Sequence, residues 1–487
     1  MRLSELKIEG QQPWIDCHSE VTGITSDSRK VTPGTIFAAW KGEHTDGHRF
    51  IDDALANGAS AVLYEYDTTV KSSVPSYKSA NVRRDYSSLA YQIAGIPGTS
   101  IDLIGITGTN GKTTTTQMVA NLLRGLGKRV GTIGTLGAEV DGEVFRQGMT
   151  TPPAEIVASD LLQMHDAGVE YCVMEVSSHA LSQERLYGLQ FQSAVWTNLT
   201  PEHLDFHGSM EAYADAKAQL FRDYCPDSSH WVMNADDDVV SAYALPDTFT
   251  FGIHGESLSD RNIEIVSNRF ETNKTQSTLR INGVEHRINS PFIGLFNVYN
   301  LAAAIGVVSR LGFSLESVLK VVETLDGIPG RMEIVSDSNE PLVLVDYAHT
   351  PDALKKALST LDDLPHNRII CVFGCGGDRD QEKRPVMGQI VSESADICYL
   401  TNDNPRHESP DAIAEMILEG INDVNREKVH VILNREGAIR AALQSSQIDD
   451  IVLIAGKGHE NYQINGNEVV DFDDRKIARK YLSETFA

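Results

Sequence analysis

The sequence lacks the cysteine patterns that indicate a metal centre, a redox motif or a disulfide framework. Six cysteines occur in 487 residues, with no Cys-x-x-Cys spacing. We therefore expect buried free thiols. The spacing of Cys371 and Cys375 is compatible with a redox pair, but the two flank an apolar strand-to-turn segment, which favours packed thiols.

Basic residues are also scarce, because 42 Lys and Arg face 68 Asp and Glu for a formal charge of −26. This balance argues against a nucleic-acid surface and leaves room for a basic pocket that binds an anionic substrate. No stretch approaches the ~20 apolar residues of a membrane span. The start, MRLSELKIEG, carries charges where a signal peptide needs an apolar core. We expect a cytoplasmic monomer with no nucleic-acid or membrane partner.

The length predicts several domains, since one hydrophobic core rarely serves so long a chain. Residues 1–97 contain strand-like runs, TIFAAW and SAVLYE, and one helix-like segment, RFIDDALANGA. Residues 98–328 begin with a strand, a glycine-rich loop and a helix, and end near the turn DGIPGR. Residues 329–487 alternate apolar strands with helices. Such alternation predicts parallel sheets flanked by helices, with ligands at the carboxyl ends of the strands.

The glycine-rich loop is GITGTNGKTTTTQM, between an apolar run and the helix-like VANLLRGLGK. Lys112 follows a glycine and precedes two threonines at the expected start of the helix. Backbone N–H groups, the helix dipole, the lysine charge and a magnesium-binding hydroxyl would then converge on one phosphate. The general P-loop spacing is not met, because Gly108 rather than Gly105 is the glycine close to Gly111. The alternative, an ordinary turn before a helix, is the weaker interpretation.

The heptapeptide GTNGKTT after an apolar strand resembles the ATP loop of the Mur ligases, which add amino acids to the peptidoglycan precursor, and of the related folylpolyglutamate synthetase. The resemblance covers essentially the whole chain. The first motif is similar to the uridine-nucleotide-binding segment of the ligases that add the third residue. The motifs, in the order of the family, are TSDSRKVTPGTIFAAWKGEHTDGHRFI, MTTPP, MEVSSHAL, NLTPEHLDFHG, YADAKAQLF, PGRMEIV, VDYAHTPDAL, FGCGGDRDQEKRP, DNPR and GKGHE.

The resemblance implies an α/β protein of three domains: a small N-terminal α/β domain that binds UDP-MurNAc, a central P-loop-type ATP domain with a mainly parallel sheet, and a Rossmann-like C-terminal domain that binds the amino acid. It also implies an acid–amino-acid ligase in peptidoglycan synthesis. Such a ligase moves the γ-phosphoryl group of ATP to a carboxylate, and an amine attacks the acyl phosphate. Because the early species are anionic, charge neutralisation by Lys112 and Mg²⁺ should dominate catalysis.

By the same resemblance, ATP binds at residues from both the second and third regions. Arg331 and Asp346 lie beyond the DGIPG turn, so domain closure over ATP is expected. The ATP-binding residues are Gly108, Thr109, Asn110, Gly111, Lys112, Thr113, Thr114, Asn297 or Asn300, Arg331, Asp346 and His349.

The resemblance assigns catalytic roles to Lys112, Glu175, His203 and Lys217, and magnesium to Thr113 and the last three. His203 is the weaker metal ligand, since Mg²⁺ prefers oxygen. Lys217 falls in a predicted amphipathic helix, where an exposed lysine is the ordinary outcome. The family carbamylates this lysine to N6-carboxylysine, which can bind a second magnesium ion. That reaction needs a neutral amine, so a lowered pKa is expected at Lys217.

The nucleotide-sugar peptide, UDP-N-acetylmuramoyl-L-Ala-D-Glu, is assigned to hydroxyl, amide and charged residues of the first two regions. Arg185 suits a diphosphate or a carboxylate, whereas the threonines before Pro152 also suit a plain turn. The matching positions are Ser26, Ser28, Glu43, His44, Thr45, Met149, Thr150, Thr151, Ser177, Gln183 and Arg185.

The acceptor is expected to be meso-2,6-diaminopimelate rather than lysine. Diaminopimelate carries an extra distal carboxylate, and Arg406 of the DNPR motif offers it a planar fork. The alternative interpretation of the tetrapeptide is an Asn-Pro turn with a solvated arginine and no role in binding. The residues assigned to this pocket are Arg379, Asp403, Asn404, Pro405, Arg406, Gly456 and Glu460.

The sequence alone leaves three alternative functions: a lysine-adding Mur ligase, a ligase like folylpolyglutamate synthetase, and a P-loop ATPase that needs no acceptor. The DSR and DGHRF segments of the first region have no role in folylpolyglutamate synthetase. Phosphate release that depends on both an acceptor and the nucleotide peptide separates a ligase from an ATPase.

Overall fold

The computed structural model describes residues 1–8, 12–14, 17–42, 45–65, 74–98, 100–253, 263–271, 274–337 and 339–486. Glu43 and His44, two of the positions assigned to the nucleotide peptide, lie outside the described residues. The chain forms two compact units. One comprises Met1–Glu264, Ile281–Gly283 and Tyr299–Val321, and the other comprises Ile265–Arg280, Val284–Val298 and Val322–Ala487.

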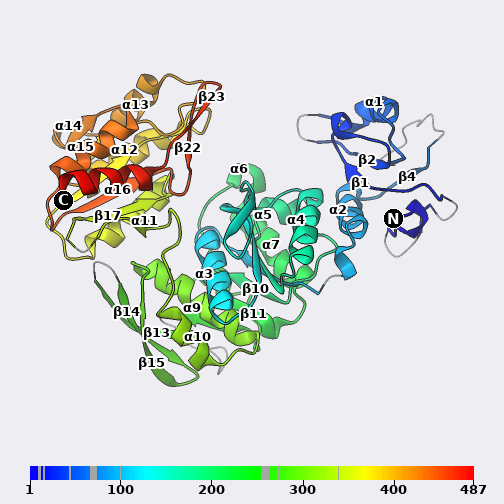
Figure 1. Ribbon diagram of the computed structural model, residues 1–487, viewed down its shortest axis with the longest axis horizontal. Helices are drawn as coiled ribbons and strands as arrows, with labels where there is room; N and C mark the ends of the chain where they lie inside the picture. The colour runs from blue at the N-terminus through cyan, green and yellow to red at the C-terminus, as the bar shows by residue number, and fades with distance from the viewer. Residues whose placement is uncertain are drawn as a thin grey trace. The chain divides into compact units, whose positions relative to one another are not determined.

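The first unit begins with a small parallel sheet of order β1-β2-β3-β4, which Figure 1 draws in blue. Alternate side chains of β2 point to opposite faces. Phe37 packs with Ile51 and Ala54 of α1 on one face, whereas Ile36 packs with Leu89 of α2 on the other. The elements are β1 (Gly23–Thr25), β2 (Thr35–Ala39), α1 (Ile51–Ala56), β3 (Ala61–Tyr64), β4 (Ser76–Lys78) and α2 (Val82–Ile93).

The expectation of one helix in residues 1–97 is wrong, because α2 is a second one. Its sequence is polar, but Val82, Tyr86, Leu89 and Ala90 recur at helical spacing and are buried. The Asn81 side chain caps the amino end by accepting from the N–H of Arg84.

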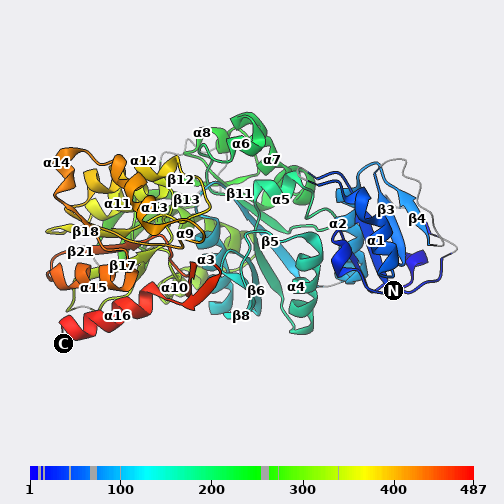
Figure 2. The ribbon, with the colours of Figure 1, turned by 90° about the horizontal axis from the view of Figure 1, so that it is seen from above.

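The central sheet of the first unit has β5 in its middle, with the order β12-β11-β10-β5-β9-β6-β7-β8. Its strands are parallel from β12 to β6, and β7 and β8 are antiparallel. Figure 2 shows α3 and α4 beside the strands. The strands are β5 (Asp102–Thr107), β6 (Val130–Gly134), β7 (Gly137–Val140), β8 (Glu143–Arg146), β9 (Tyr171–Glu175), β10 (Ser193–Trp196), β11 (Trp231–Asn234) and β12 (Phe249–Gly252).

Helices connect these strands and bring the loops to the carboxyl ends of β5, β9 and β10. Helix α7 begins after Ser209, which caps it by accepting from Ala212 N–H, as expected for the predicted amphipathic helix. The helices are α3 (Lys112–Gly125), α4 (Ala154–Asp166), α5 (Ser178–Ser182), α6 (Leu204–His207), α7 (Met210–Gln219), α8 (Asp238–Ser241), α9 (Leu295–Arg310) and α10 (Leu315–Val322). Short 3₁₀ turns cover Leu3–Glu5, Ser28–Lys30, Gly47–Phe50, Ile96–Gly98 and Ser228–His230, and a π turn covers Leu220–Tyr224.

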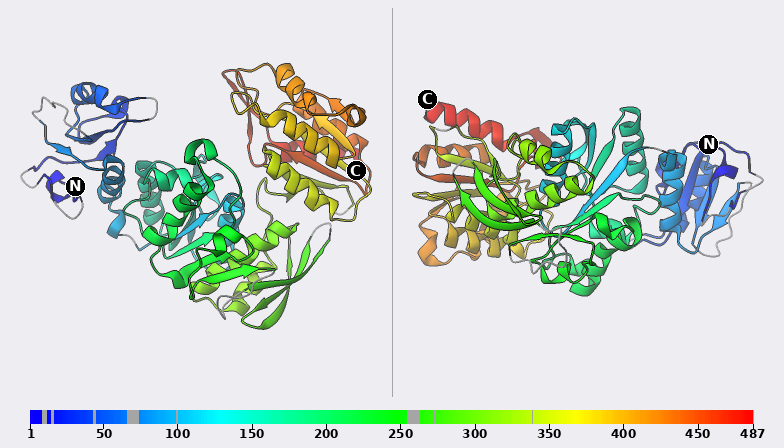
Figure 3. Two further views of the ribbon diagram at one scale, coloured as in Figure 1. Left: turned by 180° about the vertical axis from the view of Figure 1, so that it is seen from behind. Right: turned by 90° about the horizontal axis from the view of Figure 1, so that it is seen from below.

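The second unit has a six-stranded sheet of order β16-β17-β21-β18-β19-β20 in which only β16 is antiparallel. Leu344 faces α11, α12 and α13, and its neighbours Val343 and Val345 face α15 and α16. Figure 3 shows α11 and α12 (yellow) on the face opposite α16 (red). The strands are β16 (Glu333–Ile334), β17 (Leu342–Asp346), β18 (Ile369–Phe373), β19 (Ile397–Leu400), β20 (Val429–Val431) and β21 (Ile451–Ala455).

The other elements of the second unit include the hairpin β22 (Tyr462–Asn465) and β23 (Glu468–Asp471). The helices are α11 (Pro351–Asp362), α12 (Lys383–Ser394), α13 (Pro410–Glu419), α14 (Asp423–Arg426), α15 (Arg435–Ser445) and α16 (Asp474–Thr485). Three further strands are β13 (Ile263–Phe270), β14 (Thr275–Ile281) and β15 (Val284–Ser290). The α/β fold with mainly parallel sheets is confirmed, and the predicted domain boundaries, after residues 97 and 328, stay a prediction.

The cysteines are free, and all but Cys17, which is half-buried, lie in the interior. Burial raises the pKa of Cys375 to about 12, so its thiol is unreactive near neutral pH. Within the described part of the chain, no helix is long and apolar enough to cross a membrane.

Candidate functional site

The glycine-rich loop leaves the carboxyl end of β5 in a conformation that needs glycine. Gly108 and Gly111 have φ angles of 146° and 85°. A Cβ on Gly108 would lie 1.9 Å from Oγ1 of Thr197, and one on Gly111 would lie 2.4 Å from Oδ1 of Asn300. Of the two asparagines proposed for ATP, Asn300 is therefore the one beside this loop. Asn297 is buried and donates to the Ile293 carbonyl.

Asn198, which we did not single out from the sequence, fastens the loop. The Asn198 carbonyl accepts from Thr109 N–H at 3.0 Å, and its side-chain oxygen accepts from Asn110 N–H at 2.9 Å. The Thr197 hydroxyl donates to the Asn110 carbonyl at 2.6 Å. Both residues stand in the motif NLTPEHLDFHG or directly before it, which was the available signal.

Two lysines converge on one carbonyl of the loop. Lys112 Nζ donates to the carbonyls of Gly108 and Thr109 at 2.9 and 2.8 Å. Lys217 Nζ donates to the same Gly108 carbonyl at 2.9 Å. The charge of Lys112 at the amino end of α3 makes a site for an anion such as a phosphate.

Lys217 is buried, with 1% of its surface exposed, and lies 4.6 Å from the ring centroid of Tyr213. Burial, and then the charge of Lys112, lower its pKa well below the ordinary value. This is the direction expected from the sequence. A lowered pKa provides the neutral amine that carbamylation requires.

Glu175 ends β9 and gathers hydroxyl groups around its buried carboxylate. Thr113 Oγ1 donates to Oε2 at 3.0 Å, and Thr135 donates through its N–H to Oε1 at 2.7 Å and through its hydroxyl to Oε2 at 3.1 Å. A carboxylate and a hydroxyl beside a phosphate-binding loop form an oxygen donor set that fits Mg²⁺. Thr113 and Glu175 would hold the ion, which would neutralise phosphate charge.

His203, another of the proposed magnesium ligands, directly precedes α6. It has a φ of 56° at the amino end of α6 and packs against the rings of His179 at 4.6 Å and Tyr213 at 6.3 Å. Its ring nitrogen lies 3.8 Å from Glu202. Among the described residues, no group of three or more His, Cys, Asp and Glu could hold a metal ion. The proposed role of His203 therefore requires the carbamylated form of Lys217 or the phosphates as additional ligands.

Residues assigned to the nucleotide peptide meet beside Glu175. Thr151 Oγ1 donates to the Glu175 carbonyl and accepts from Ser177 N–H, at 2.8 and 2.9 Å. Arg185 donates to the Thr151 carbonyl at 2.5 Å and twice to the Gln183 side chain.

Other members of the nucleotide-peptide set lie more openly. The Thr150 hydroxyl is 3.3 Å from that of Thr135, and Met149 is 49% exposed. Ser26 and Thr45 are exposed, whereas Ser28 is buried and its carbonyl accepts from Asn57.

The ATP residues of the second unit surround the end of β17. The carboxylate of Asp346 accepts from the N–H groups of Met332 and Ala348, both at 2.8 Å, and burial raises its pKa. Arg331 lies 4.8 Å from the ring centroid of Tyr347. His349 bonds to the Tyr347 carbonyl at 2.7 Å, and burial lowers its pKa.

The DNPR loop follows β19 and brings polar groups of opposite charge together. Arg406 has a φ of 51° and donates through Nη1 to the Gly377 carbonyl at 2.9 Å. Asn404 is 3% exposed and donates through Nδ2 to Oε2 of Glu460 at 2.8 Å. A Cβ on Gly456 would lie 2.7 Å from a carboxylate oxygen of Asp403. Five of the seven predicted acceptor residues therefore lie close together, while Pro405 is buried beside them and Arg379 is exposed.

A buried ion pair that we missed joins the loops that carry Arg379 and Arg406. Arg384 is completely buried and donates to both oxygens of Glu408 at 2.8 and 2.9 Å. Glu408 also accepts from Asp378 N–H, next to Arg379. Arg384 stands in the motif FGCGGDRDQEKRP, but nothing in the sequence indicates its partner.

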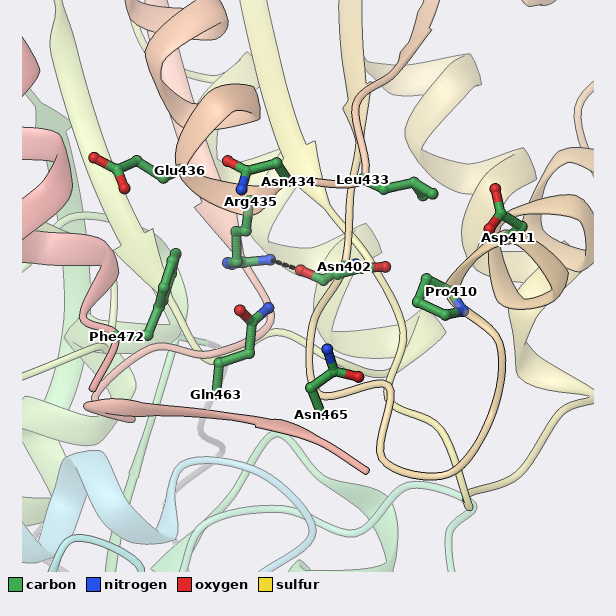
Figure 4. A pocket seen from close by; sticks show the side chains of 10 residues that line it. All are labelled: Asn402, Pro410, Asp411, Leu433, Asn434, Arg435, Glu436, Gln463, Asn465 and Phe472. Atoms are coloured by element: carbon green, nitrogen blue, oxygen red, sulfur yellow. Dashed lines mark hydrogen bonds between the residues drawn. The ribbon is translucent and has the colours of Figure 1, made fainter. Parts of the chain in front are cut away.

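A cavity of about 390 Å³ lies nearby, where the amino ends of α13 and α15 meet (Figure 4). In that view Arg435 donates to the Asn402 carbonyl at 3.2 Å. Arg435 also donates through Nε and Nη2 to the two carboxylate oxygens of Asp474. None of the predicted acceptor residues lines this cavity. Its lining residues are Asn402, Pro410, Asp411, Leu433, Asn434, Arg435, Glu436, Gln463, Asn465 and Phe472.

Family models match three successive segments of the chain. Residues 20–97 match the Mur ligase family catalytic domain, residues 106–308 the Mur ligase middle domain, and residues 330–458 the Mur ligase glutamate ligase domain. The chain belongs to the Mur ligase family. Members of this family are ATP-dependent ligases, so the resemblance seen in the motifs and the enzyme class are confirmed.

Mur ligases similar to the chain extend over almost its full length. A UDP-N-acetylmuramoyl-L-alanyl-D-glutamate--2,6-diaminopimelate ligase of Syntrophomonas wolfei is 39% identical over 99% of the chain and 98% of its own length. The Haemophilus influenzae ligase of the same name is 40% identical, covering 95% and 96%. A solved structure of a ligase with this name is 34% identical, with a TM-score of 0.71 over 99% of this chain and 98% of that one.

Proposed function

We propose that the chain adds meso-2,6-diaminopimelate to the D-glutamate of UDP-N-acetylmuramoyl-L-Ala-D-Glu, with cleavage of ATP to ADP and phosphate. The reaction is a step in the synthesis of the peptidoglycan precursor. The named relatives, about 40% identical over nearly the whole chain, support this assignment.

The observation that carries the proposal is the charge arrangement at the carboxyl ends of β19 and β21. Arg406 and Glu460 both bond to Asn404, because Arg406 Nη1 donates to the Asn404 carbonyl at 3.5 Å and the Asn404 side chain donates to Oε2 of Glu460 at 2.8 Å. The distal end of diaminopimelate is a carboxylate and an ammonium group on one carbon. A cation and an anion that both contact Asn404 are complementary to that pair, whereas lysine supplies only the ammonium group.

The ATP half of the reaction is supported by the glycine-rich loop. The backbone of residues 108–111 is held open by Asn198, and Lys112 can exchange its loop carbonyls for phosphate oxygens. Thr113 and Glu175 are proposed to hold Mg²⁺ against these oxygens. Lys112 would neutralise the charge that develops while the γ-phosphoryl group moves to the glutamate carboxylate.

Lys217 is proposed to act as N6-carboxylysine. Carbamylation joins the neutral amine to carbon dioxide and releases one proton to solvent, so a neutral group becomes an anion. The resulting carboxylate would lie beside the glycine loop and would help to hold a second Mg²⁺ with His203.

An acceptor screen tests the proposed function. Phosphate release is measured with ATP, Mg²⁺ and UDP-N-acetylmuramoyl-L-Ala-D-Glu while the amino acid is varied between meso-diaminopimelate, L-lysine, L-glutamate and none. We expect turnover with diaminopimelate only, with kcat/KM for lysine lower by on the order of 10⁴. Equal use of lysine would overturn the acceptor, and turnover without any amino acid would overturn ligation itself.

A further inference from the structure

Lys457 is a completely buried lysine between two residues assigned to the acceptor pocket, Gly456 and Glu460. It lies in the turn after β21, where Gly456 and Gly458 have φ angles of 114° and 53°. The Glu460 N–H donates to the Lys457 carbonyl at 3.0 Å, which closes the turn and places both side chains on one side.

The ammonium group of Lys457 binds two acceptor-site side chains at once. Nζ donates to Oδ1 of Asn404 at 3.1 Å and to Oε2 of Glu460 at 2.9 Å. It also lies 5.5 Å from the ring centroid of Tyr462. A buried ammonium group must be paired in this way, because an unpaired charge in the interior loses its hydration without compensation.

These contacts decide which way the amide of Asn404 points. The two ends of an amide have the same shape, so only their neighbours distinguish oxygen from nitrogen. Oδ1 accepts from Lys457 and from Ile464 N–H at 2.9 Å, and both of these groups can only donate. Nδ2 is thereby directed to Oε2 of Glu460, at 2.8 Å.

The same contacts orient Glu460. Both Asn404 and Lys457 bond to Oε2, so Oε1 is the oxygen that an incoming ammonium group can use. Lys457 also offsets the negative charge of Glu460 and stabilises a carboxylate whose side chain is only 15% exposed.

We propose that Lys457 is a positioning residue for acceptor binding by the ligase. It holds the carboxylate of Glu460, together with the Asn404 amide that donates to this carboxylate, in the orientation that leaves Oε1 to receive the distal ammonium group of the amino acid. This inference rests on the proposed function, which supplies the acceptor.

Replacement of Lys457 by Met tests the inference, because Met fills similar space without a donor or a charge. One hydrogen bond to a charged group contributes enough binding to change affinity about 10- to 100-fold. We therefore expect the KM for diaminopimelate to rise by that factor in Lys457→Met, while the KM values for ATP and the nucleotide peptide stay within twofold.

The matched control is Arg368→Met, which also removes a cation from a buried carboxylate of this unit. Arg368 pairs with Asp450 at 2.5 Å, at the amino ends of β18 and β21 and hence away from the acceptor loops. We expect a lower melting temperature and an unchanged KM for diaminopimelate. A merely structural role for Lys457 predicts the same result in Lys457→Met, and that result would overturn the inference.

Lys457→Arg replaces Lys457→Met if the latter is not folded by circular dichroism. Its guanidinium group keeps the charge but is larger than the ammonium group, so in this fully buried site it displaces Asn404 and Glu460 and the same rise in KM is expected. A KM for diaminopimelate within twofold of the unmutated value in the folded variant refutes the positioning role. Failure of the unmutated enzyme to use any amino acid instead overturns the proposed function, and the inference with it.

Discussion

The replacement of Arg406 by Ala should damage the use of diaminopimelate and leave ATP binding intact. Arg406 is half-buried, and its recorded contacts to Gly377 and Asn404 both use Nη1. The remaining edge of the guanidinium group is the one available to a carboxylate. The substitution does not change the backbone strain at a φ of 51°, because Arg and Ala both carry a Cβ.

The magnitude follows from the hydrogen bonds that are lost. A bond to a charged group contributes about 1.5–3 kcal/mol. Because Arg406 is partly exposed, solvent weakens its contacts. We therefore expect its two hydrogen bonds to the substrate carboxylate to contribute about 3 kcal/mol in total rather than twice that value. Since 1.4 kcal/mol is tenfold, kcat/KM for diaminopimelate should fall about 100-fold.

The assay is initial-rate ADP release with diaminopimelate varied at saturating ATP and nucleotide peptide, and then with ATP varied. Arg406→Lys serves as the comparison, since it keeps the charge and loses the planar fork. It should be intermediate. The reasoning would be refuted if kcat/KM for diaminopimelate fell less than threefold in Arg406→Ala, or if the KM for ATP rose equally.

Three further outcomes are expected. Lys217→Ala should lose ligation by about 100-fold or more, measured as product formed, with partial recovery on addition of a short carboxylate; full activity would contradict the metal role. Gly108→Ala places a Cβ 1.9 Å from the Thr197 hydroxyl and should abolish ATP binding, as measured by calorimetry. The control is Gly127→Ala, where φ is 80° and no atom lies within 4 Å of the added Cβ, and it should lower the free energy of unfolding by only about 1 kcal/mol. Arg384→Met should lower the free energy of urea unfolding at pH 7 by about 3 kcal/mol. The Arg384 hydrogen bond lowers the pKa of Glu408 from 4.5, so this contribution is present above pH 4.5 and lost as pH falls through the lower folded value. Equal effects of Arg384→Met at pH 7 and pH 3 would disprove the coupling.

The strands and the glycine loop could be predicted because their signals are local. Apolar runs bounded by glycines gave β5, β9 and the strands of the second unit, and Ser209 marked the start of α7. Helix α2 was missed because charged and hydroxyl side chains interrupt its apolar stripe. Its stability comes from packing against the first sheet and α4, which the sequence does not display.

The parts of the site that could not be predicted depend on contacts between distant segments. Arg384 meets Glu408, and Lys457 meets Asn404 across 53 residues. Nothing in the spacing of such pairs distinguishes them from exposed surface charges. The burial of Lys217 could not be predicted from its spacing either. Only the resemblance of its segment to a known motif indicated that it has a functional role.

The β22-β23 hairpin gives the acceptor site a further property. Its backbone pairs with the DNPR loop, because Ile464 accepts from Arg406 N–H at 3.2 Å and Gly466 donates to the Arg406 carbonyl at 2.6 Å. Gln463 donates to the Asp403 carbonyl at 2.7 Å. The proposed acceptor site thus depends on two segments of the chain that lie about 60 residues apart in the sequence. If the DNPR tetrapeptide alone were transferred to another ligase, Arg406 would lack the hairpin contacts that hold its loop in place. Both segments would therefore have to be exchanged together.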